Sequence, residues 1–273
     1  MHYGFVLPGG TPRTLVERAV QAEGAGWDAV FVWEAAYGPD AWTVLAAAAE
    51  RTSRIRLGTM LTPLPWRRPW KLASQVATLD QLSDGRAILT VGLGAPDVST
   101  ARPLDALDRR ERAALLDDGI DLIDALWSGA LVYDGPRFQV DLTGGPIGEF
   151  RPVQRPRPPI WVVGAWPRPA SMRRVLRADG LVPNVMDPEF RPTTPDDIRA
   201  MVSWLRAHGA PEGFDVVVEG ATPTDPTDAA AVVQPWNDAG ATWWIEALWV
   251  VPDGADHDAL VLERLQAGPP ALP

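Results

Sequence analysis

The sequence contains no cysteine and only three histidines among its 273 residues. Without cysteine there can be no disulfide framework, no thiolate zinc site, no iron–sulfur cluster and no cysteine nucleophile. Three histidines leave few ligands for a histidine-rich metal centre, so we expect no metal site. No stretch approaches the roughly 20 apolar residues that a membrane-spanning helix needs.

Basic residues are outnumbered, with 25 Lys and Arg against 35 Asp and Glu, which gives a net charge of −10. An acidic balance argues against a nucleic-acid-binding surface. The first residues, Met1 to Gly4, lack the basic region and apolar run of a secretory signal. We therefore expect a cytoplasmic protein whose partner is a small molecule, with neither nucleic acid nor a membrane as a partner.

Short apolar segments alternate with amphipathic ones along most of the chain. The predicted strands are 3–7, 29–33, 55–61, 87–91, 160–163, 181–185, 216–219 and 242–248. The helices predicted after them are 14–24, 39–51, 70–82, 109–127, 170–178, 195–208, 229–239 and 258–265. Buried strands alternating with helices predict a parallel sheet with right-handed crossovers. Eight such units close into a (β/α)₈ barrel (a TIM barrel), which we expect to be a single domain over residues 1–273.

The alternation pauses between the fourth and fifth strands. Residues 129–159 are rich in Gly and Pro and predict a short hairpin, an excursion from the barrel and not a second domain. A doubly wound open sheet is the alternative, and it would need a glycine-rich dinucleotide turn after its first strand. Neither Pro8-Gly9-Gly10 nor Gly92-Leu93-Gly94 has the spacing of that turn.

In a barrel of this kind the functional site lies at the C-terminal ends of the strands. The sequence places aromatic, glycine and polar residues there: Trp33, Glu34, Tyr37, Thr62, Trp66, Gly92, Gly94, Gly164, Trp166, Arg168, Ser171, Glu219 and Glu246. Aromatic walls suit a flat apolar ring, and backbone N–H groups at a helix start suit a phosphate. None of the three histidines has a clear place at this face, and no G-x-S-x-G motif indicates a serine hydrolase.

Structural interpretations of the same residues stay open. The segment 164–171 is also compatible with an ordinary strand-to-helix loop, and Glu219 and Glu246 with carboxylates that pair with arginines. Asp117, Asp118 and Asp121 are most simply a solvated helix face.

Several segments occur in an order that resembles the bacterial luciferase-like flavin-dependent oxidoreductases. They are Gly4–Pro8, Ala22–Glu34, Arg51–Thr59, Ala77–Arg86 and Pro152–Gly164. The run Thr-Leu-Asp-Gln-Leu-Ser-Asp-Gly-Arg at 78–86, directly before a strand that ends in Gly-x-Gly, is the most specific of them.

The resemblance implies a barrel that binds FMN, or the related deazaflavin coenzyme F-420 (F420), at its C-terminal face. It implies redox chemistry, either hydride transfer or oxygen activation. By position, Gly164, Arg168 and Ser171 would hold the phosphate, with Ala165 and Trp166 in the same cofactor-binding loop. Gly92 and Gly94 would border the cofactor, and Met60, Leu61 and Thr62 would support its ring near a frequent non-proline cis peptide. The substrate pocket would be lined by Trp33, Tyr37, Trp66, Glu219 and Glu246.

The sequence departs from the family at two places. Many relatives carry an acid followed by histidine after the second strand, whereas here Glu34 is followed by Ala35; we expect Glu34 to act as the acid/base or substrate-orienting group. The segment 95–109, which covers the substrate in relatives, is short. Two alternatives remain: a flavin-binding barrel without turnover, and a hydrolase or lyase that uses Glu34 with Glu219 or Glu246. Relatives are often homodimers, and this chain is a candidate for one.

Overall fold

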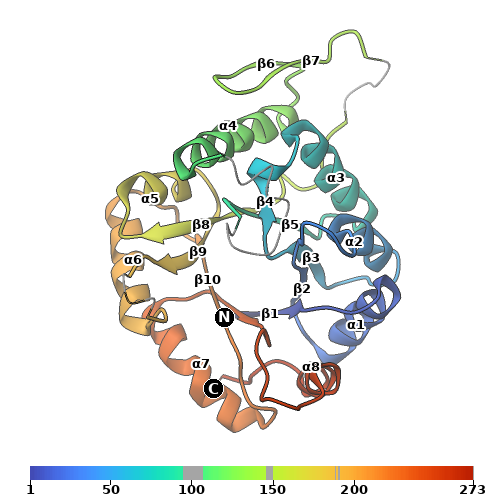
Figure 1. The fold of residues 1–273 in the computed structure, drawn as a ribbon, viewed down its shortest axis with the longest axis vertical. Helices are drawn as coiled ribbons and strands as arrows, with labels where there is room; N and C mark the ends of the chain where they lie inside the picture. The colour runs from blue at the N-terminus through green and yellow to red at the C-terminus, as the bar shows by residue number, and fades with distance from the viewer. Residues whose placement is uncertain (95–106, 146–149, 188, 190, 273) are drawn as a thin grey trace.

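A computed structural model describes residues 1–94, 107–145, 150–187, 189 and 191–272. Eight parallel strands form a closed barrel (Figure 1), as predicted. They are β1 (His2–Leu7), β2 (Ala29–Val32), β3 (Arg56–Thr59), β5 (Ala87–Gly92), β8 (Ile160–Trp166), β9 (Gly180–Val185), β10 (Asp215–Gly220) and β11 (Trp243–Glu246). The barrel closes because β1 pairs with β11 and β3 pairs with β5. The predicted third strand is divided: the short β4 (Thr62–Pro63) follows β3 and pairs with the end of β5.

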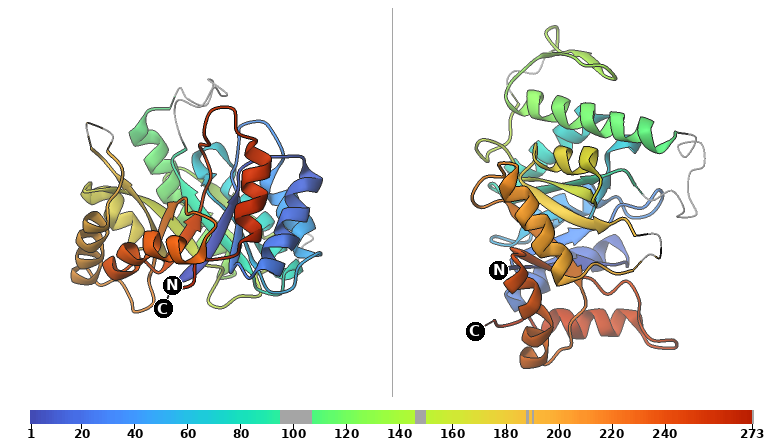
Figure 2. Two further views of the ribbon diagram at one scale, coloured as in Figure 1. Left: turned by 90° about the horizontal axis from the view of Figure 1, so that it is seen from below. Right: turned by 90° about the vertical axis from the view of Figure 1, so that its left-hand side faces the viewer.

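Helices surround the barrel (Figure 1). They are α1 (Pro12–Ala25), α2 (Ala41–Ala49), α3 (Pro69–Leu82), α4 (Arg109–Trp127), α5 (Pro169–Val175), α6 (Pro195–Ala207), α7 (Pro226–Ala239) and α8 (His257–Gln266), with a 3₁₀ turn η1 (Leu64–Trp66) after β4. Within the described segments, no helix is long and apolar enough to span a membrane. Both chain ends lie where β1 begins, at the end of the barrel opposite the loops that follow the strands (Figure 2, left).

Two apolar layers alternate along the strands. On β2, Val30 and Val32 belong to the layer between the strands and the helices, while Phe31 belongs to the layer inside the barrel. Inside, the Trp161 ring lies 5.5 Å from Phe31 and 5.1 Å from Trp243. The Asp215 carboxylate accepts a hydrogen bond from the indole N–H of Trp161 and another from that of Trp243, both at 3.0 Å. Since side chains alternate between the faces of a strand, residues two positions beyond this layer reach the C-terminal face of the barrel.

The predicted excursion contains the hairpin of β6 (Val132–Asp134) and β7 (Gln139–Asp141), which lies outside α4 (Figure 1). Asp118 of α4 anchors it. This carboxylate is 3% exposed and accepts hydrogen bonds from the Tyr133 hydroxyl and the N–H groups of Arg137 and Phe138. The expectation that Asp118 belongs to a solvated helix face is therefore wrong, because the hairpin covers it.

The segment 78–86, the most specific part of the family resemblance, is structural. Asp80 is fully buried and accepts hydrogen bonds from the N–H groups of Val153 and Gln154. Arg86 donates to the carbonyls of Ala49 and Ile55. These bonds join the turn between α3 and β5 to the segment between α2 and β3 and to the loop before β8. The segment 78–86 therefore supports the barrel away from its C-terminal face.

Candidate functional site

Glu34 follows β2 and forms an ion pair with Arg67, which follows η1. The Glu34 side chain is 7% exposed, and its Oε2 atom has no hydrogen-bond partner among the described residues. Burial lowers the pKa of Arg67. The pair thus places a carboxylate at the C-terminal face with one oxygen free to accept a hydrogen bond.

The backbone between β3 and β4 crosses the same face, with a cis peptide between Met60 and Leu61. The hydroxyls of Thr59 and Thr62 are hydrogen-bonded at 2.9 Å. A Cβ atom at Gly92 would lie 3.1 Å from Leu61 and 3.2 Å from Val163, so any side chain there would require these two neighbours to shift.

Gly94 follows β5 with φ of +78°, and a Cβ atom there would lie 3.0 Å from Pro63 and from the ring of Trp66. Gly92 thus lies beside Leu61 and Gly94 beside Pro63, and we call Gly92, Gly94 and the segment 60–62 the glycine surface.

Three arginines gather beside this surface. Arg109 and Arg112 lie in the first turn of α4, and Arg168 precedes α5 as its N-cap. Burial, followed by the positive charges of Arg168 and Arg112, lowers the pKa of Arg109. Arg112 donates from Nη1 to the Gly94 carbonyl at 3.2 Å. Like charges held together stabilise a bound anion, and arginine matches phosphate geometry.

The loop after β8 has a more structural character than expected. The Ser171 hydroxyl accepts a hydrogen bond from the Ala165 N–H at 2.9 Å. A Cβ atom at Gly164 would lie 2.3 Å from Leu181 and 3.0 Å from Val175, so this glycine permits the close approach of β9 and α5. The Trp166 ring packs edge-on against Trp204 of α6, with 6.4 Å between centroids. Trp166 therefore faces the helix layer, and the expectation that its ring borders the cofactor is wrong.

Four buried polar atoms that have no hydrogen-bond partner among the described residues lie near the C-terminal end of the barrel. They are Glu34 Oε2, Trp66 Nε1, Thr90 Oγ1 and Arg112 Nε. Burying an unpaired polar group costs free energy, and in native structures such groups commonly meet water or a ligand. Donors and acceptors of this kind, next to the glycine surface and the arginines, suit a ring with polar edges that carries a phosphate.

A second set of side chains lies on the other side of this face. Glu219 is two residues beyond Val217, which faces the barrel interior. Its side chain is exposed, yet burial by the surrounding wall raises its pKa, with a hydrogen bond from Trp249 acting in the opposite direction. Trp249 also meets the ring of Trp33 edge-on, with 6.5 Å between centroids. Tyr37 is fully exposed and contacts none of them in the described structure.

Glu246 lies outside this group. It is completely buried and accepts from the N–H and hydroxyl of Thr222, both at 2.7 Å. Arg264 of α8 lies 3.4 Å from its carboxylate. Glu246 shares the outward face of β11 with Trp244, so the expectation that it lines a substrate pocket is wrong, and the alternative of an arginine-paired structural carboxylate holds.

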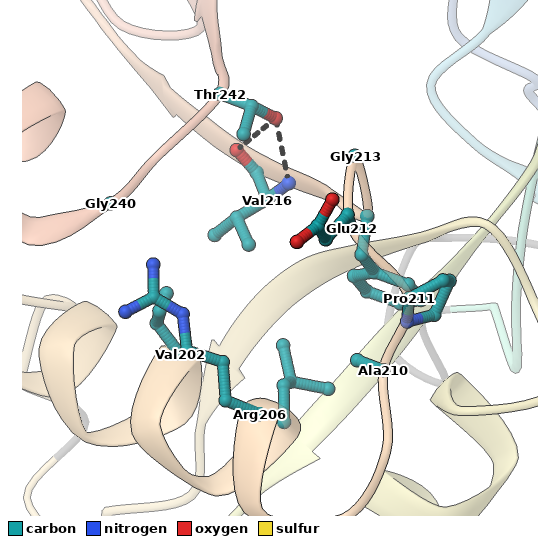
Figure 3. A pocket seen from close by; sticks show the side chains of 11 residues that line it. Val202, Arg206, Ala210, Pro211, Glu212, Gly213, Val216, Gly240 and Thr242 are labelled. Atoms are coloured by element: carbon teal, nitrogen blue, oxygen red, sulfur yellow. Dashed lines mark hydrogen bonds between the residues drawn. The ribbon is translucent and has the colours of Figure 1, made fainter.

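A hollow of about 520 Å³ lies at the opposite end of the barrel, between α6, α7 and the start of β10 (Figure 3). Arg206 and Glu212 stand on its rim over apolar residues such as Val202, and both charged side chains are exposed. No predicted site residue lines it.

Sequence reasoning missed Arg67, Thr90, Arg109 and Arg112 as site residues. Arg67 lies soon after a predicted strand end, whereas α4 follows β5 only after a long segment, so the first turn of α4, with Arg109 and Arg112, could not be placed from the sequence. Most of the segment 95–109, which we expected to be a short cover, lies outside the described residues.

Comparisons with known proteins identify the family of the chain. A sequence model of luciferase-like monooxygenases matches residues 2–262. The F420-dependent glucose-6-phosphate dehydrogenase of Amycolatopsis mediterranei is 36% identical over 163 residues, which cover 50% of this chain and 49% of that protein. The oxygenase component of the flavin-dependent trigonelline monooxygenase of Acinetobacter baylyi is 31% identical over 129 residues, which cover 47% of this chain and 35% of that protein.

The fold has a full-length counterpart among solved structures. The coenzyme F420-dependent tetrahydromethanopterin reductase of Methanopyrus kandleri superposes with a TM-score of 0.76 at 18% identity, covering 98% of both chains. The chain spans about half or less of the length of the curated relatives named above. Because the family model covers nearly the whole sequence, the chain belongs to the luciferase-like monooxygenase family.

Proposed function

We propose that the protein is an oxidoreductase that uses FMN or the deazaflavin F420, bound at the C-terminal face of the barrel, to act on a small organic substrate. The observation that carries this proposal is the gathering of Arg109, Arg112 and Arg168 beside a glycine surface. Such a cluster suits the phosphate that both cofactors carry. Relatives named for each cofactor support both choices.

The residues present fit such a cofactor. Arg109, Arg112 and Arg168 would hold the phosphate, together with the Ser171 hydroxyl, and Gly92, Gly94 and the segment 60–62 would support the ring. When bound, the cofactor supplies the redox chemistry, as hydride transfer or as oxygen activation. Glu34 would orient the ring or the substrate through Oε2, because Arg67 holds its other oxygen.

The decisive test is a titration of the cofactor-free protein with FMN and with F420, followed by cofactor fluorescence. We expect one of the two to bind, and Arg109→Ala to weaken binding by about tenfold or more, since a charge-assisted hydrogen bond contributes about 1.5–3 kcal/mol. Arg110→Ala is the matched control, because Arg110 is exposed in the same turn. A protein that binds neither cofactor at micromolar concentration contradicts the proposal.

Turnover separates the main proposal from a flavin-binding barrel that does not react. The bound chromophore should be bleached by a reductant and restored by substrate or by air. A chromophore that is never restored favours the non-catalytic alternative. The other alternative is a hydrolase or lyase that uses Glu34 with Glu219 or Glu246. Its Glu246 form is less well supported, because Glu246 lies in the helix layer.

The proposal extends to the cellular location and the partners of the protein. We propose that the protein works in the cytoplasm with a small-molecule substrate and without nucleic acid. The homodimer that the family resemblance implies stays a prediction, which sedimentation velocity can test.

A further inference from the structure

The hollow between α6, α7 and the start of β10 is concave and lies at the end of the barrel opposite the candidate cofactor site (Figure 3). Its volume of about 520 Å³ falls within the range of about 300–1,000 Å³ that is usual for small-molecule pockets. Its walls come from α6, from the loop that joins α6 to β10, and from the turn that joins α7 to β11. The hollow is therefore large enough for a small ligand that does not touch the C-terminal face.

The floor of the hollow is apolar. Val202 and Leu205 of α6 line it together with Phe214 and Val216 at the start of β10. Each of these four side chains is at most 9% exposed, so they are packed into the helix layer and present only a small surface to the hollow. An apolar group that lies on this floor leaves water, which favours binding.

The wall opposite α6 is fixed by hydrogen bonds. The Thr242 hydroxyl accepts from the Val216 N–H at 2.9 Å and donates to the Asp215 carboxylate at 3.2 Å. Gly240 ends α7 with φ of +99°. A wall that is already ordered loses little conformational entropy when a ligand binds, so less of the binding free energy is lost.

Two opposite charges stand over this floor. Arg206 lies in the last turn of α6, and Glu212 lies in the loop before β10. Their side chains extend from different sides of the hollow (Figure 3), and both are exposed. Within the part of the chain that the structure describes, neither side chain forms an ion pair or a hydrogen bond. A guanidinium binds a carboxylate through paired N–H groups, and a carboxylate binds an ammonium group.

We propose that the hollow binds a small zwitterion whose ammonium and carboxylate groups are separated by an apolar body. The ligand carboxylate pairs with Arg206, its ammonium group pairs with Glu212, and its apolar body lies on Val202 and Val216. A dipeptide with two apolar side chains has this chemistry, because its charged ends are separated by a peptide unit. A free amino acid fits less well, because it carries both charges on one carbon while Arg206 and Glu212 stand apart. This site is independent of the proposed function.

The probe is L-leucyl-L-phenylalanine, added to the full chain and followed by two-dimensional ¹H–¹⁵N NMR. The backbone signals of Gly213, Gly240 and Thr242 should shift in a saturable way, because these residues line the hollow. The signals of Gly92 and Gly94, at the other end of the barrel, should not move. The absence of shifts at millimolar dipeptide, or shifts confined to Gly92 and Gly94, would overturn the proposal.

The two charges can be tested one at a time. Arg206→Gln should weaken binding of the dipeptide about two- to fivefold, the effect typical of an exposed ion pair, and leave binding of its C-terminal amide unchanged. Glu212→Gln should weaken binding of the dipeptide by a similar factor and leave binding of its N-acetyl derivative unchanged. Arg199→Gln is the matched control, because Arg199 is exposed on the same helix and does not line the hollow. Equal losses for all three ligands in either variant would contradict the assigned pairing.

The apolar floor has its own variants. Ala210→Trp places a large ring in the hollow and should abolish the shifts that the dipeptide causes. Val202→Thr keeps the shape of the floor, adds a hydroxyl group and should weaken binding. An unchanged far-UV circular dichroism spectrum shows that a variant is folded. Undiminished dipeptide binding by folded Ala210→Trp protein would overturn the hollow as the site.

The outcomes stay distinct from those of the cofactor titration. Dipeptide binding involves neither FMN nor F420, so a protein that binds neither cofactor contradicts the proposed function alone. A protein that binds a cofactor but causes no dipeptide shifts contradicts the present inference alone.

Discussion

At the scale of single residues, the acidic side chains divide according to how many donors surround them. Glu23 accepts from the backbone N–H groups of Ser53, Arg54 and Ile55, and Asp80 is similarly enclosed by donors. Such carboxylates are part of the scaffold, because each accepts hydrogen bonds from several backbone N–H groups of other segments. Glu34 keeps one oxygen without a hydrogen-bond partner among the described residues, and the Glu219 side chain is exposed. A ligand at the C-terminal face can therefore contact both carboxylates.

Glu23 provides a test of the scaffold role. Burial raises its pKa, but the three backbone hydrogen bonds outweigh it and leave the pKa below its ordinary value. Glu23→Gln should lower the free energy of unfolding at neutral pH by about 1–3 kcal/mol, because the charge-assisted bonds weaken. The contribution of the carboxylate is present above the unfolded pKa and disappears as pH falls through the lower folded value. Urea denaturation at several pH values checks this, and a difference that persists in acid would contradict it.

Asp215 should show the opposite pH dependence. Burial raises its pKa, against the hydrogen bonds from Trp161, Thr242 and Trp243. The folded state then binds its proton more tightly than the unfolded state, so its contribution to stability falls as pH rises from the unfolded pKa through the folded one. Asp215→Asn should remove this dependence. The comparison is between the stability–pH curves of wild type and variant, and parallel curves would disprove the expectation.

At the scale of elements, the helix starts show what local sequence signals can and cannot predict. Thr11 and Asp225 are N-caps, each followed directly by proline as the first helical residue. Proline is favoured there because its missing N–H would have no helical partner. The predicted helices 14–24 and 229–239 nevertheless begin two or three residues late, because the apolar periodicity starts only after the cap.

The break between β3 and β4 could not be read from the sequence. Residues 55–61 predict a single strand. In the fold, the chain leaves β3 at Thr59 and resumes pairing only at Thr62, where β4 reaches the end of β5. The reason is tertiary: Leu61 packs beside Gly92, and only the assembled barrel brings these residues together.

Gly94 offers a test at this scale. Its φ of +78° and the nearby Trp66 ring disfavour any side chain. Gly94→Ala should cost about 1–2 kcal/mol of stability, as expected for a left-handed backbone in a residue with a Cβ atom. It should also weaken cofactor binding, because Arg112 is bonded to the Gly94 carbonyl. Gly9→Ala, where a Cβ atom would meet nothing within 4 Å, is the control; equal thermal shifts in the two variants would refute this explanation.

At the scale of the whole molecule, closure makes distant parts of the chain depend on one another. β1 lies between β2 and β11, and Trp27 after α1 donates to the Leu265 carbonyl of α8 at 2.9 Å. Loss of β1 or of β11 would remove two strand pairings and expose the apolar layer inside the barrel. We therefore expect one domain, as the repeating strand–helix pattern predicts.

A single cooperative transition is the corresponding prediction. Far-UV circular dichroism and the fluorescence of the thirteen tryptophans should report the same midpoint in urea. The tryptophans lie both inside the barrel and in the helix layer, so the fluorescence samples both layers. Two separated midpoints would indicate independently folding parts.

The alternation of strands and helices, the hairpin after α4 and the family could all be predicted from the amino-acid sequence, because periodicity, turn residues and short motifs are local properties. The contacts between distant side chains could be seen only in the folded barrel. Glu246 and Trp166 end strands as a site residue would, yet they face the helices, because alternation along the strand sends them outward. Arg112 and Gly94 meet at the C-terminal face although 18 residues separate them. Side-chain direction and long-range contact depend on strand register and barrel closure, which no single segment specifies.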